Sequence, residues 1–436
     1  MDLWSDPLKR RWVVWGALAT AFLLVNVHRL STAVLSEDLM RAFDTTGAAL
    51  GTLHSAFFYI YAPMQVAAGV LADRLGIRRT ATIGTVVMSA GGLAFGLADS
   101  YLVAFFARVC IGLGASVIFI ATLRFCANWF RPDEFATMNG LTVGLAGLGG
   151  IVATTPLAVV VTTLGLRSTL LAMGAVGLLI AVVVWSLALD TPADAGLPAI
   201  DNVPSAPTLS LSQVGRNVRT VFAERETWLA GLALFTSTGV NITVLGLWGV
   251  PYVAQVYDLS LTAASTLTLA GSVGLLVGPP VVGRLSDRLG RRTELMIVGA
   301  TLYTVAFGAL SLLGKPPLPV VGLIFFSASF LAGSYALGYT VVKNRHGSAS
   351  SGVATGAVNA VGFAGAAVFP TVMGLVLDAY WTGEMLAGAR VYTMLGYRLM
   401  FGLAAAGGLF SLCCVTYLHL RTGGRSGAGG AAAADA

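Results

Sequence analysis

The chain has 436 residues, of which 56% are hydrophobic and only 11% charged, and its mean hydropathy is +0.81. Soluble domains carry about 25% charged residues, so this composition excludes an ordinary soluble protein and predicts one whose solvent is lipid. The formal net charge of +6 does not indicate nucleic-acid binding, because the basic residues lie in short loops between apolar runs rather than on one solvated face.

Apolar runs divide the chain into membrane-crossing segments. A helix that crosses a bilayer needs about 20 mostly apolar residues, and the first such run lacks the cleavage site of a signal peptide. We therefore predict twelve membrane helices, beginning with this run. In chain order they cover residues 12–34, 47–71, 80–98, 101–128, 135–162, 168–189, 227–252, 262–283, 294–313, 319–343, 351–377 and 396–418.

One long polar segment separates the sixth run from the seventh, and it holds four prolines and several charges. The fold expected is an all-α integral membrane protein of two pseudo-symmetric six-helix bundles. We assign residues 1–189 to the first bundle, 190–226 to a cytoplasmic linker, 227–420 to the second bundle, and the Gly/Ala-rich residues 421–436 to a disordered tail.

The distribution of basic residues predicts the orientation. If the N-terminus lies in the cytoplasm and each run crosses once, the cytoplasmic segments hold 18 of the 26 Lys and Arg residues. Basic residues concentrate in cytoplasmic loops, so both termini are expected in the cytoplasm. The Gly/Ala-rich composition points to a bacterial inner membrane.

An internal repeat supports the division into halves. Residues 69–80 read GVLADRLGIRRT, and 214 positions later residues 283–293 read GRLSDRLGRRT. The same offset brings Pro156 onto Pro370 and Arg131 onto Arg345. A duplicated six-helix unit explains all three matches, and parallel repeats of this kind place the substrate near the membrane midplane between the halves.

Each copy of the repeat joins the second and third helices of its half. Its first glycine is expected to permit close helix contact, and its acid to accept hydrogen bonds from a neighbouring helix or to pair with an arginine. Its second glycine is expected to make the turn, and its basic residues to hold the loop at the anionic leaflet. We predict a gating latch; the alternative is a plain turn that carries positive-inside charges. The gating residues are Gly69, Asp73, Arg74, Gly76, Arg78, Gly283, Asp287, Arg288, Gly290 and Arg292.

These loops resemble the GxLaDrxGrr signature of the major facilitator superfamily. The segment from Arg108 through Gly112 to Gly114 also resembles the family's fourth-helix signature. The fifth-helix signature, associated mainly with drug antiporters, is only partly met because Pro156 is displaced. The resemblance implies a central cavity and alternating access by rocking of the halves, without ATP. The weakness of the fifth-helix signature argues against drug export.

Arg29 lies within the first run, in LLVNVHRLSTAV. In the family this helix lines the cavity, and Arg29 resembles the anion-binding residue of organophosphate antiporters and sialin-like transporters. A guanidinium fork suits carboxylate or phosphate. The alternative is that Arg29 reaches the outer surface or pairs with Glu37 or Asp38.

The balance of interior charges favours an anion. Arg29, Arg108 and Arg124 lie inside runs, and no Asp or Glu lies deep within any run, which predicts a positive cavity. The organophosphate antiporters carry a second arginine where the repeat offset places Thr243, so a dianionic phosphate ester fits less well than a monocarboxylate or an amino acid. Arg108 resembles a residue linked to proton coupling or anion binding in relatives; its alternative role is a structural hydrogen bond between helices.

We therefore predict secondary active transport of a small organic anion or zwitterion, coupled to protons. Alternatives are efflux of amphipathic drugs or a siderophore, and a non-transporting sensor on a transporter fold. The sequence shows no nucleophile–base pair, metal cluster or cofactor motif, so we expect no enzyme, cofactor or metal. The expected partners are the lipid bilayer, a small-molecule substrate and protons, and the expected state is a monomer. The substrate-binding candidates are Arg29, Asn26, Arg108, Tyr59, Gln65, Asn241, Trp248 and Asn359, and the coupling candidates are His28, His54 and Arg108.

Overall fold

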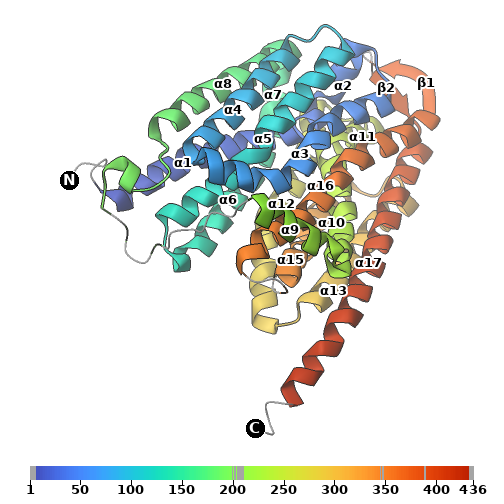
Figure 1. Cartoon of the computed structure of the whole chain (residues 1–436). Coiled ribbons are helices and arrows are strands. Elements are labelled where there is room, and N and C mark those ends of the chain that lie inside the picture. The colour runs from blue at the N-terminus through green and yellow to red at the C-terminus, as the bar shows by residue number, and fades with distance from the viewer. Residues whose placement is uncertain are drawn as a thin grey trace.

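The structure is a computed structural model that describes residues 6–198, 200, 203, 211–343, 345, 348–386 and 389–431. Long helices packed side by side make up most of it (Figure 1). The first half of the chain forms α1 (Pro7–Leu30), α2 (Thr32–Phe43), α3 (Gly47–Leu75), α4 (Ile77–Gly96), α5 (Tyr101–Trp129), α6 (Pro132–Val152), α7 (Thr155–Leu164) and α8 (Leu166–Leu187).

The second half repeats this pattern after a connecting segment that holds the 3-10 turn η1 (Ala193–Ala195) and α9 (Leu211–Ala223). It forms α10 (Arg225–Thr243), the π-helical η2 (Val244–Trp248), α11 (Gly249–Tyr257), α12 (Leu261–Leu289), α13 (Arg292–Leu313), α14 (Leu318–Phe330), α15 (Ala332–Lys343), α16 (Ser348–Ala379), the strands β1 (Trp381–Leu386) and β2 (Ala389–Tyr392), and α17 (Met394–Ala431).

Local sequence signals explain where several of these helices begin and end. The hydroxyls of Thr46, Ser100 and Ser260 accept hydrogen bonds from the first turns of α3, α5 and α12, which satisfies backbone donors that have no partner within the helix. Gly76 ends α3 with a φ of +80° and Gly290 ends α12 with a φ of +67°, a conformation that favours glycine. The two copies of the repeated loop thus turn at corresponding glycines.

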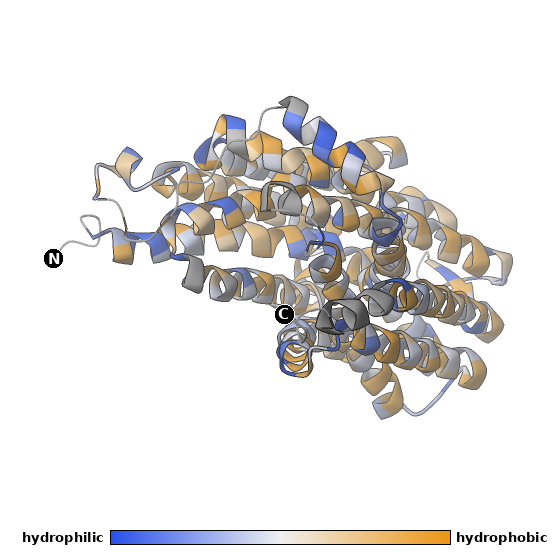
Figure 2. Ribbon diagram, turned by 60° about the horizontal axis from the view of Figure 1, so that its bottom comes forward, coloured by the Kyte–Doolittle hydropathy of each residue, from blue (hydrophilic) through white to orange (hydrophobic). Residues whose placement is uncertain are grey.

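The membrane-spanning segments agree with the predicted runs. Ten of the described helices are long and apolar enough to cross a membrane, and the pair α6–α7, bent by 41°, makes an eleventh. The remaining predicted run, 80–98, corresponds to α4, which is not among these candidate spans and packs against α5 and α8. Figure 2 shows hydrophobic residues along most of the helices, and large apolar side chains such as Leu179 and Leu323 are exposed at the surface, as lipid-facing helices require.

The structure differs from the sequence-based expectation in four places. The first apolar run does not end at residue 34, because the chain continues after Ser31 as α2 as far as Phe43. The loop before α17 contains the short antiparallel hairpin β1–β2, which the sequence did not predict within the otherwise helical fold. The linker contains the helix α9, and α17 runs on to Ala431, past the predicted start of a disordered tail. The domain boundaries themselves stay a prediction.

The two halves meet mainly where α3 lies along α16. A Cβ on Gly51 would be 2.2 Å from the carbonyl oxygen of Pro370, and one on Gly374 would be 2.3 Å from that of Gly47. Such spacing leaves no room for a side chain larger than hydrogen. These contacts lie at the end of the bundle that carries β1–β2, which we call the hairpin end; the opposite end, which carries both copies of the repeated loop, is the loop end.

Candidate functional site

Arg29 is buried near the end of α1 and has an unpaired donor edge. Its Nη1 donates to Oδ1 of Asn26 over 3.1 Å. Its Nε and Nη2 are buried and have no hydrogen-bond partner among the described residues. The alternative of pairing with Glu37 or Asp38 does not hold in this structure, where Asp38 pairs with Arg41. A buried, unpaired cation costs free energy, so this edge of Arg29 is suited to an anionic partner.

Aromatic rings surround this guanidinium. Its Cζ lies 4.9 Å from the ring centroid of Tyr61, 4.9 Å from that of Phe363 and 5.9 Å from that of Phe57. Tyr61 and Phe57 belong to α3, whereas Phe363 belongs to α16 in the other half. Rings attract the cation through their faces without neutralising its charge, so the enclosure remains suited to an anion.

Arg108 lies on α5 close to the same cluster. Its Nη1 donates to the carbonyl oxygen of His28 over 2.9 Å, and its Nε and Nη2 are buried without a partner among the residues that the structure describes. Its Cζ lies 5.8 Å from the ring centroids of both Phe57 and Phe95. Phe57 is therefore within 6 Å of both guanidiniums, and the two form one positively charged region. The bond to His28 also gives Arg108 a structural role.

The two histidines predicted to couple transport, His28 and His54, are buried in different settings. His28 packs inside the first half, where a Cβ on Gly92 would be 3.1 Å from its Cε1. His54 faces the other half, since a Cβ on Gly246 of η2 would be 3.1 Å from its Cε1. Neither ring nitrogen of His54 has a hydrogen-bond partner within the described part of the chain. Of the two, His54 therefore lies where relative movement of the halves would change its surroundings.

Gln65 and Asn359 form a hydrogen-bonded bridge between the halves. Nδ2 of Asn359 on α16 donates to Oε1 of Gln65 on α3 over 2.8 Å, and the hydroxyl of Tyr339 donates to Oδ1 of Asn359 over 2.6 Å. Gln65 follows Tyr61 by four positions and Asn359 precedes Phe363 by four, so each pair shares one helix face. The bridge thus lies one helical turn from the aromatic contacts of Arg29, on the side of the loop end.

The structure does not bring the remaining predicted residues to this cluster. The ring of Tyr59 is 44% exposed and packs against Phe105. Trp248 is fully buried, and its Nε1 donates to the carbonyl oxygen of Pro370 over 3.5 Å. Oδ1 of Asn241 accepts a hydrogen bond from Ser329, while its Nδ2 is unpaired within the described residues.

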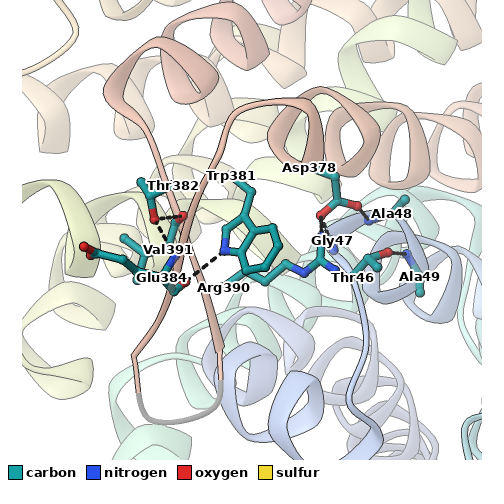
Figure 3. Close-up of polar contacts among 10 residues, drawn as sticks. All are labelled: Thr46, Gly47, Ala48, Ala49, Asp378, Trp381, Thr382, Glu384, Arg390 and Val391. Atoms are coloured by element: carbon teal, nitrogen blue, oxygen red, sulfur yellow. Dashed lines mark hydrogen bonds and ion pairs between the residues drawn. The ribbon is translucent and has the colours of Figure 1, made fainter.

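At the hairpin end, Asp378 joins the two halves (Figure 3). Its carboxylate, at the end of α16, accepts hydrogen bonds from the backbone nitrogens of Gly47 and Ala48 at the start of α3, over 2.8 and 2.7 Å. Arg390 of β2 donates to the same carboxylate over 3.2 Å and packs its guanidinium on the ring of Trp381. A carboxylate at a helix N-terminus is a favourable arrangement, so this end of the structure is closed.

The first repeated loop is held by α8 of its own half and by the connecting segment that follows α8. Nε of Arg78 donates to the carbonyl oxygen of Trp185 over 2.8 Å, and its backbone nitrogen donates to Asp190 over 3.0 Å. A Cβ on Gly76 would be 2.0 Å from the same carboxylate, so the glycine permits this approach. A Cβ on Gly69, in contrast, would meet no atom within 4 Å. The expected close helix contact at Gly69 is absent from this structure.

The second loop has fewer contacts. Asp287 forms an exposed ion pair with Arg292 over 3.8 Å, and Gly290 ends α12. A Cβ on Gly283 would meet no atom within 4 Å, so the contact expected there is also absent. Among the described residues, neither glycine therefore makes the close helix contact that was expected at the loop end.

The remaining motif residues leave the latch untested. Arg74 and Arg288 are exposed, and the side chain of Asp73 lies outside the described residues. Nearby ion pairs each join residues of a single half: Arg11 with Glu134, and Arg345 with Glu226. The latch stays a prediction.

The comparison with known families decides the identity of this two-half bundle. The profile of the Major Facilitator Superfamily matches residues 14–274 and 227–434. The chain belongs to this superfamily. The resemblance of the two repeated loops is thereby confirmed, and so is the predicted membrane fold. The protein is a multi-pass membrane transporter of a small molecule, and members of the Major Facilitator Superfamily are generally not enzymes.

Relatives and solved structures agree with this assignment. The chain is 24% identical to a probable sulfoacetate transporter of Cupriavidus necator, covering 88% of this chain and 92% of that protein. It is 23% identical to a D-galactonate transporter of Escherichia coli, covering 91% and 97%. A bacterial homologue of the human lysosomal transporter Spinster has the same fold, with a TM-score of 0.73 at 17% identity over 95% of this chain and 97% of that one.

Sequence reasoning missed the aromatic neighbours of Arg29. Phe57 and Phe363 were not among the predicted residues, because an apolar side chain does not stand out from its neighbours in an apolar run. Helical spacing contains a usable signal: Phe57, Tyr61 and Gln65 recur every four positions on one face of α3. Tyr59, two positions away from both Phe57 and Tyr61, points elsewhere.

Proposed function

We propose that the protein is a secondary active transporter of small organic anions or zwitterions that carry a carboxylate or sulfonate group. The observation that carries this proposal is the edge of Arg29, whose buried Nε and Nη2 have no partner among the described residues. Two parallel N–H donors on this edge match the two oxygens of a carboxylate or sulfonate. Asn26 holds the other end of the guanidinium, so the free edge has a fixed orientation.

Charge supports the same substrate class. Arg29 and Arg108 are both buried, and within the described part of the chain neither pairs with a carboxylate. The electrostatic attraction of an anion is stronger where water is excluded. The relatives named for sulfoacetate, D-galactonate and hexuronate transport handle organic acids, which is consistent with a positive site.

For coupling, orientation and assembly we retain the sequence-based expectations as part of the proposal. The protein works as a monomer in a bacterial inner membrane, with the loop end and both termini in the cytoplasm. Protons drive transport. His54 and His28 are the candidate proton carriers, because both are histidines placed beside the two arginines. In alternating access the loop end and the hairpin end open in turn.

The test is a thermal-shift screen of the purified protein against short carboxylates and sulfonates, amino acids and amphipathic drugs. Sulfoacetate, D-galactonate and a hexuronate are among the first group. An anion is expected to stabilise the wild type and to lose this effect in Arg29→Gln. Arg29→Lys keeps the charge but loses the fork, so its affinity is expected to fall about tenfold.

The matched control is Arg41→Gln, which removes an exposed arginine paired with Asp38 in the same half. Its anion affinity is expected to equal that of the wild type. Stabilisation by amphipathic drugs alone, unchanged in both Arg29 variants, would overturn the proposal and favour efflux. Anion binding without flux in proteoliposomes would favour a sensor.

A further inference from the structure

Arg29 is enclosed by side chains from both halves of the protein. Asn26 and Tyr61 come from the first half, and Phe363 comes from α16 in the second. Both ring centroids lie 4.9 Å from its Cζ. The enclosure of the anion-binding group is therefore complete only when α3 and α16 are in contact at this level.

The ring of Phe363 is itself fixed against the first half. It meets Tyr61 edge to face, with centroids 4.9 Å apart and planes at 73°, and it stacks on Phe58 at 6.1 Å with planes at 10°. One turn away, the bridge between Asn359 and Gln65 holds the same two helices together. Phe363 thus belongs to an ordered contact between the halves rather than to a loose apolar surface.

This geometry leaves two buried donors of the Arg29 guanidinium without a partner among the described residues. Tyr61 and Phe363 lie beside the guanidinium, and Oδ1 of Asn26 accepts a hydrogen bond from its Nη1. The buried Nε and Nη2 remain unpaired within the described residues. An ion pair formed on that edge would be shielded from water by the rings, which strengthens it. If the halves separated here, Phe363 would leave and water would reach the edge. Affinity for the anion should therefore depend on whether the halves are in contact.

We propose that Phe363 is a positioning residue that couples anion binding at Arg29 to closure of the α3–α16 interface. This inference rests on the anion-transport function proposed above. A ligand that binds one conformation better shifts the population towards that conformation. A bound anion therefore stabilises the state in which Phe363 covers Arg29. Through this ring, binding of an anion in the first half favours contact with the second half.

The test compares Phe363→Leu and Phe363→Tyr with the wild type, using sulfoacetate and D-galactonate as probes. Binding is measured by thermal shift, and exchange is measured in proteoliposomes loaded with the same anion. Leucine keeps an apolar side chain but has no ring face, so its exchange rate at saturating anion is expected to fall about tenfold, equivalent to about 1.4 kcal/mol. Its dissociation constant is expected to rise about threefold. Phe363→Tyr keeps the ring and should remain within about twofold of the wild type.

Phe235→Leu is the matched control. Phe235 is half-buried in the same half as Phe363, and its ring packs on Phe369 of that half. Wild-type exchange in Phe363→Leu, or an equal loss in Phe235→Leu, would overturn the inference. Loss of binding in Arg29→Gln together with unchanged binding and exchange in Phe363→Leu would overturn it while leaving the proposed function intact. If neither probe, nor any other anion of the screen, binds the wild type, both fall together.

Discussion

The two ends of the bundle differ in the contacts that hold the two halves together. At the hairpin end, Asp378 accepts hydrogen bonds from the first turn of α3, and Gly51 lies against the backbone of Pro370. At the loop end, Gly69 and Gly283 face open space. The same helix α3 is thus tightly packed at one end and loosely packed at the other. The difference shows a conformation closed at the hairpin end, and it identifies which contacts must break when that end opens.

The largest effect is expected from Gly51→Ala. A Cβ there would be 2.2 Å from the backbone oxygen of Pro370 and 2.6 Å from its carbon, so α3 and α16 must separate. Overpacking of this kind costs about 1–3 kcal/mol. The measurement is the rate at which a maleimide labels Thr52→Cys, a position beside this contact, in a background whose four native cysteines are replaced by serine. Labelling should accelerate more than tenfold.

Gly69→Ala, on the same helix, tests the loop end in the same way. The new methyl group meets no atom within 4 Å, and alanine is favoured over glycine within a helix. Labelling at Thr52→Cys and the melting temperature should therefore stay within error of the wild type or rise slightly. Equal effects from the two substitutions would contradict the difference between the ends.

A smaller effect is expected from Asp378→Asn, which removes the charge that α3 and Arg390 share. Hydrogen bonds to a charged group contribute about 1.5–3 kcal/mol each, and an amide retains part of that. The labelling rate of Thr52→Cys should rise about tenfold, corresponding to about 1.4 kcal/mol.

Asp38→Asn is the control for this variant, because Asp38 pairs with Arg41 within α2. Among the described residues, Asp38 makes no hydrogen bond or ion pair with the second half. Its labelling rate should match the wild type. If the labelling rate of Thr52→Cys stayed unchanged in Asp378→Asn, closure of the hairpin end would depend on the glycine contacts alone.

The fold was predictable from sequence because the apolar runs mark the membrane helices and the repeated loop marks the two related halves. The details of the hairpin end were not, since strands β1 and β2 are short and lie in a segment that reads as an ordinary outer loop. Trp248, a predicted substrate-binding residue, lies against Pro370 in this structure. It belongs to a π-helical turn, which changes the face that each following residue presents, and no pattern in the sequence marks that turn.

At the site, sequence reasoning found the charge but not its surroundings. Arg29 and Arg108 stand out because ionisable groups inside a membrane are costly. The contact of Arg29 with Phe363 joins residues from the first and the eleventh predicted membrane helices, and only the packing of the halves shows it. Asn359 and Gln65 were predicted separately, and the structure adds that they bind each other.

The smallest effect concerns an ion pair at the loop end that lies within one half. Arg11 on α1 donates to both carboxylate oxygens of Glu134 over 2.8 Å. Glu134 precedes the membrane-spanning part of α6, and the hydrogen bond from Arg11 is the main cause that lowers the pKa of its carboxyl below 4.5. Because the pair joins α1 to α6 inside the first half, it should stabilise that half without changing which end is open.

Glu134→Gln should therefore lower the melting temperature at pH 7 by about 2 °C, in line with about 1 kcal/mol for a partly exposed pair, and leave Thr52→Cys labelling unchanged. A lowered pKa in the folded state means that the stabilisation is present above pH 4.5 and is lost as the pH falls through the folded-state pKa. The difference in melting temperature between wild type and variant should accordingly disappear in that acidic range. A difference that persists there would show that packing of the side chain, rather than its charge, stabilises the contact between α1 and α6. A change in labelling would instead show that the two ends are coupled through the interior of one half.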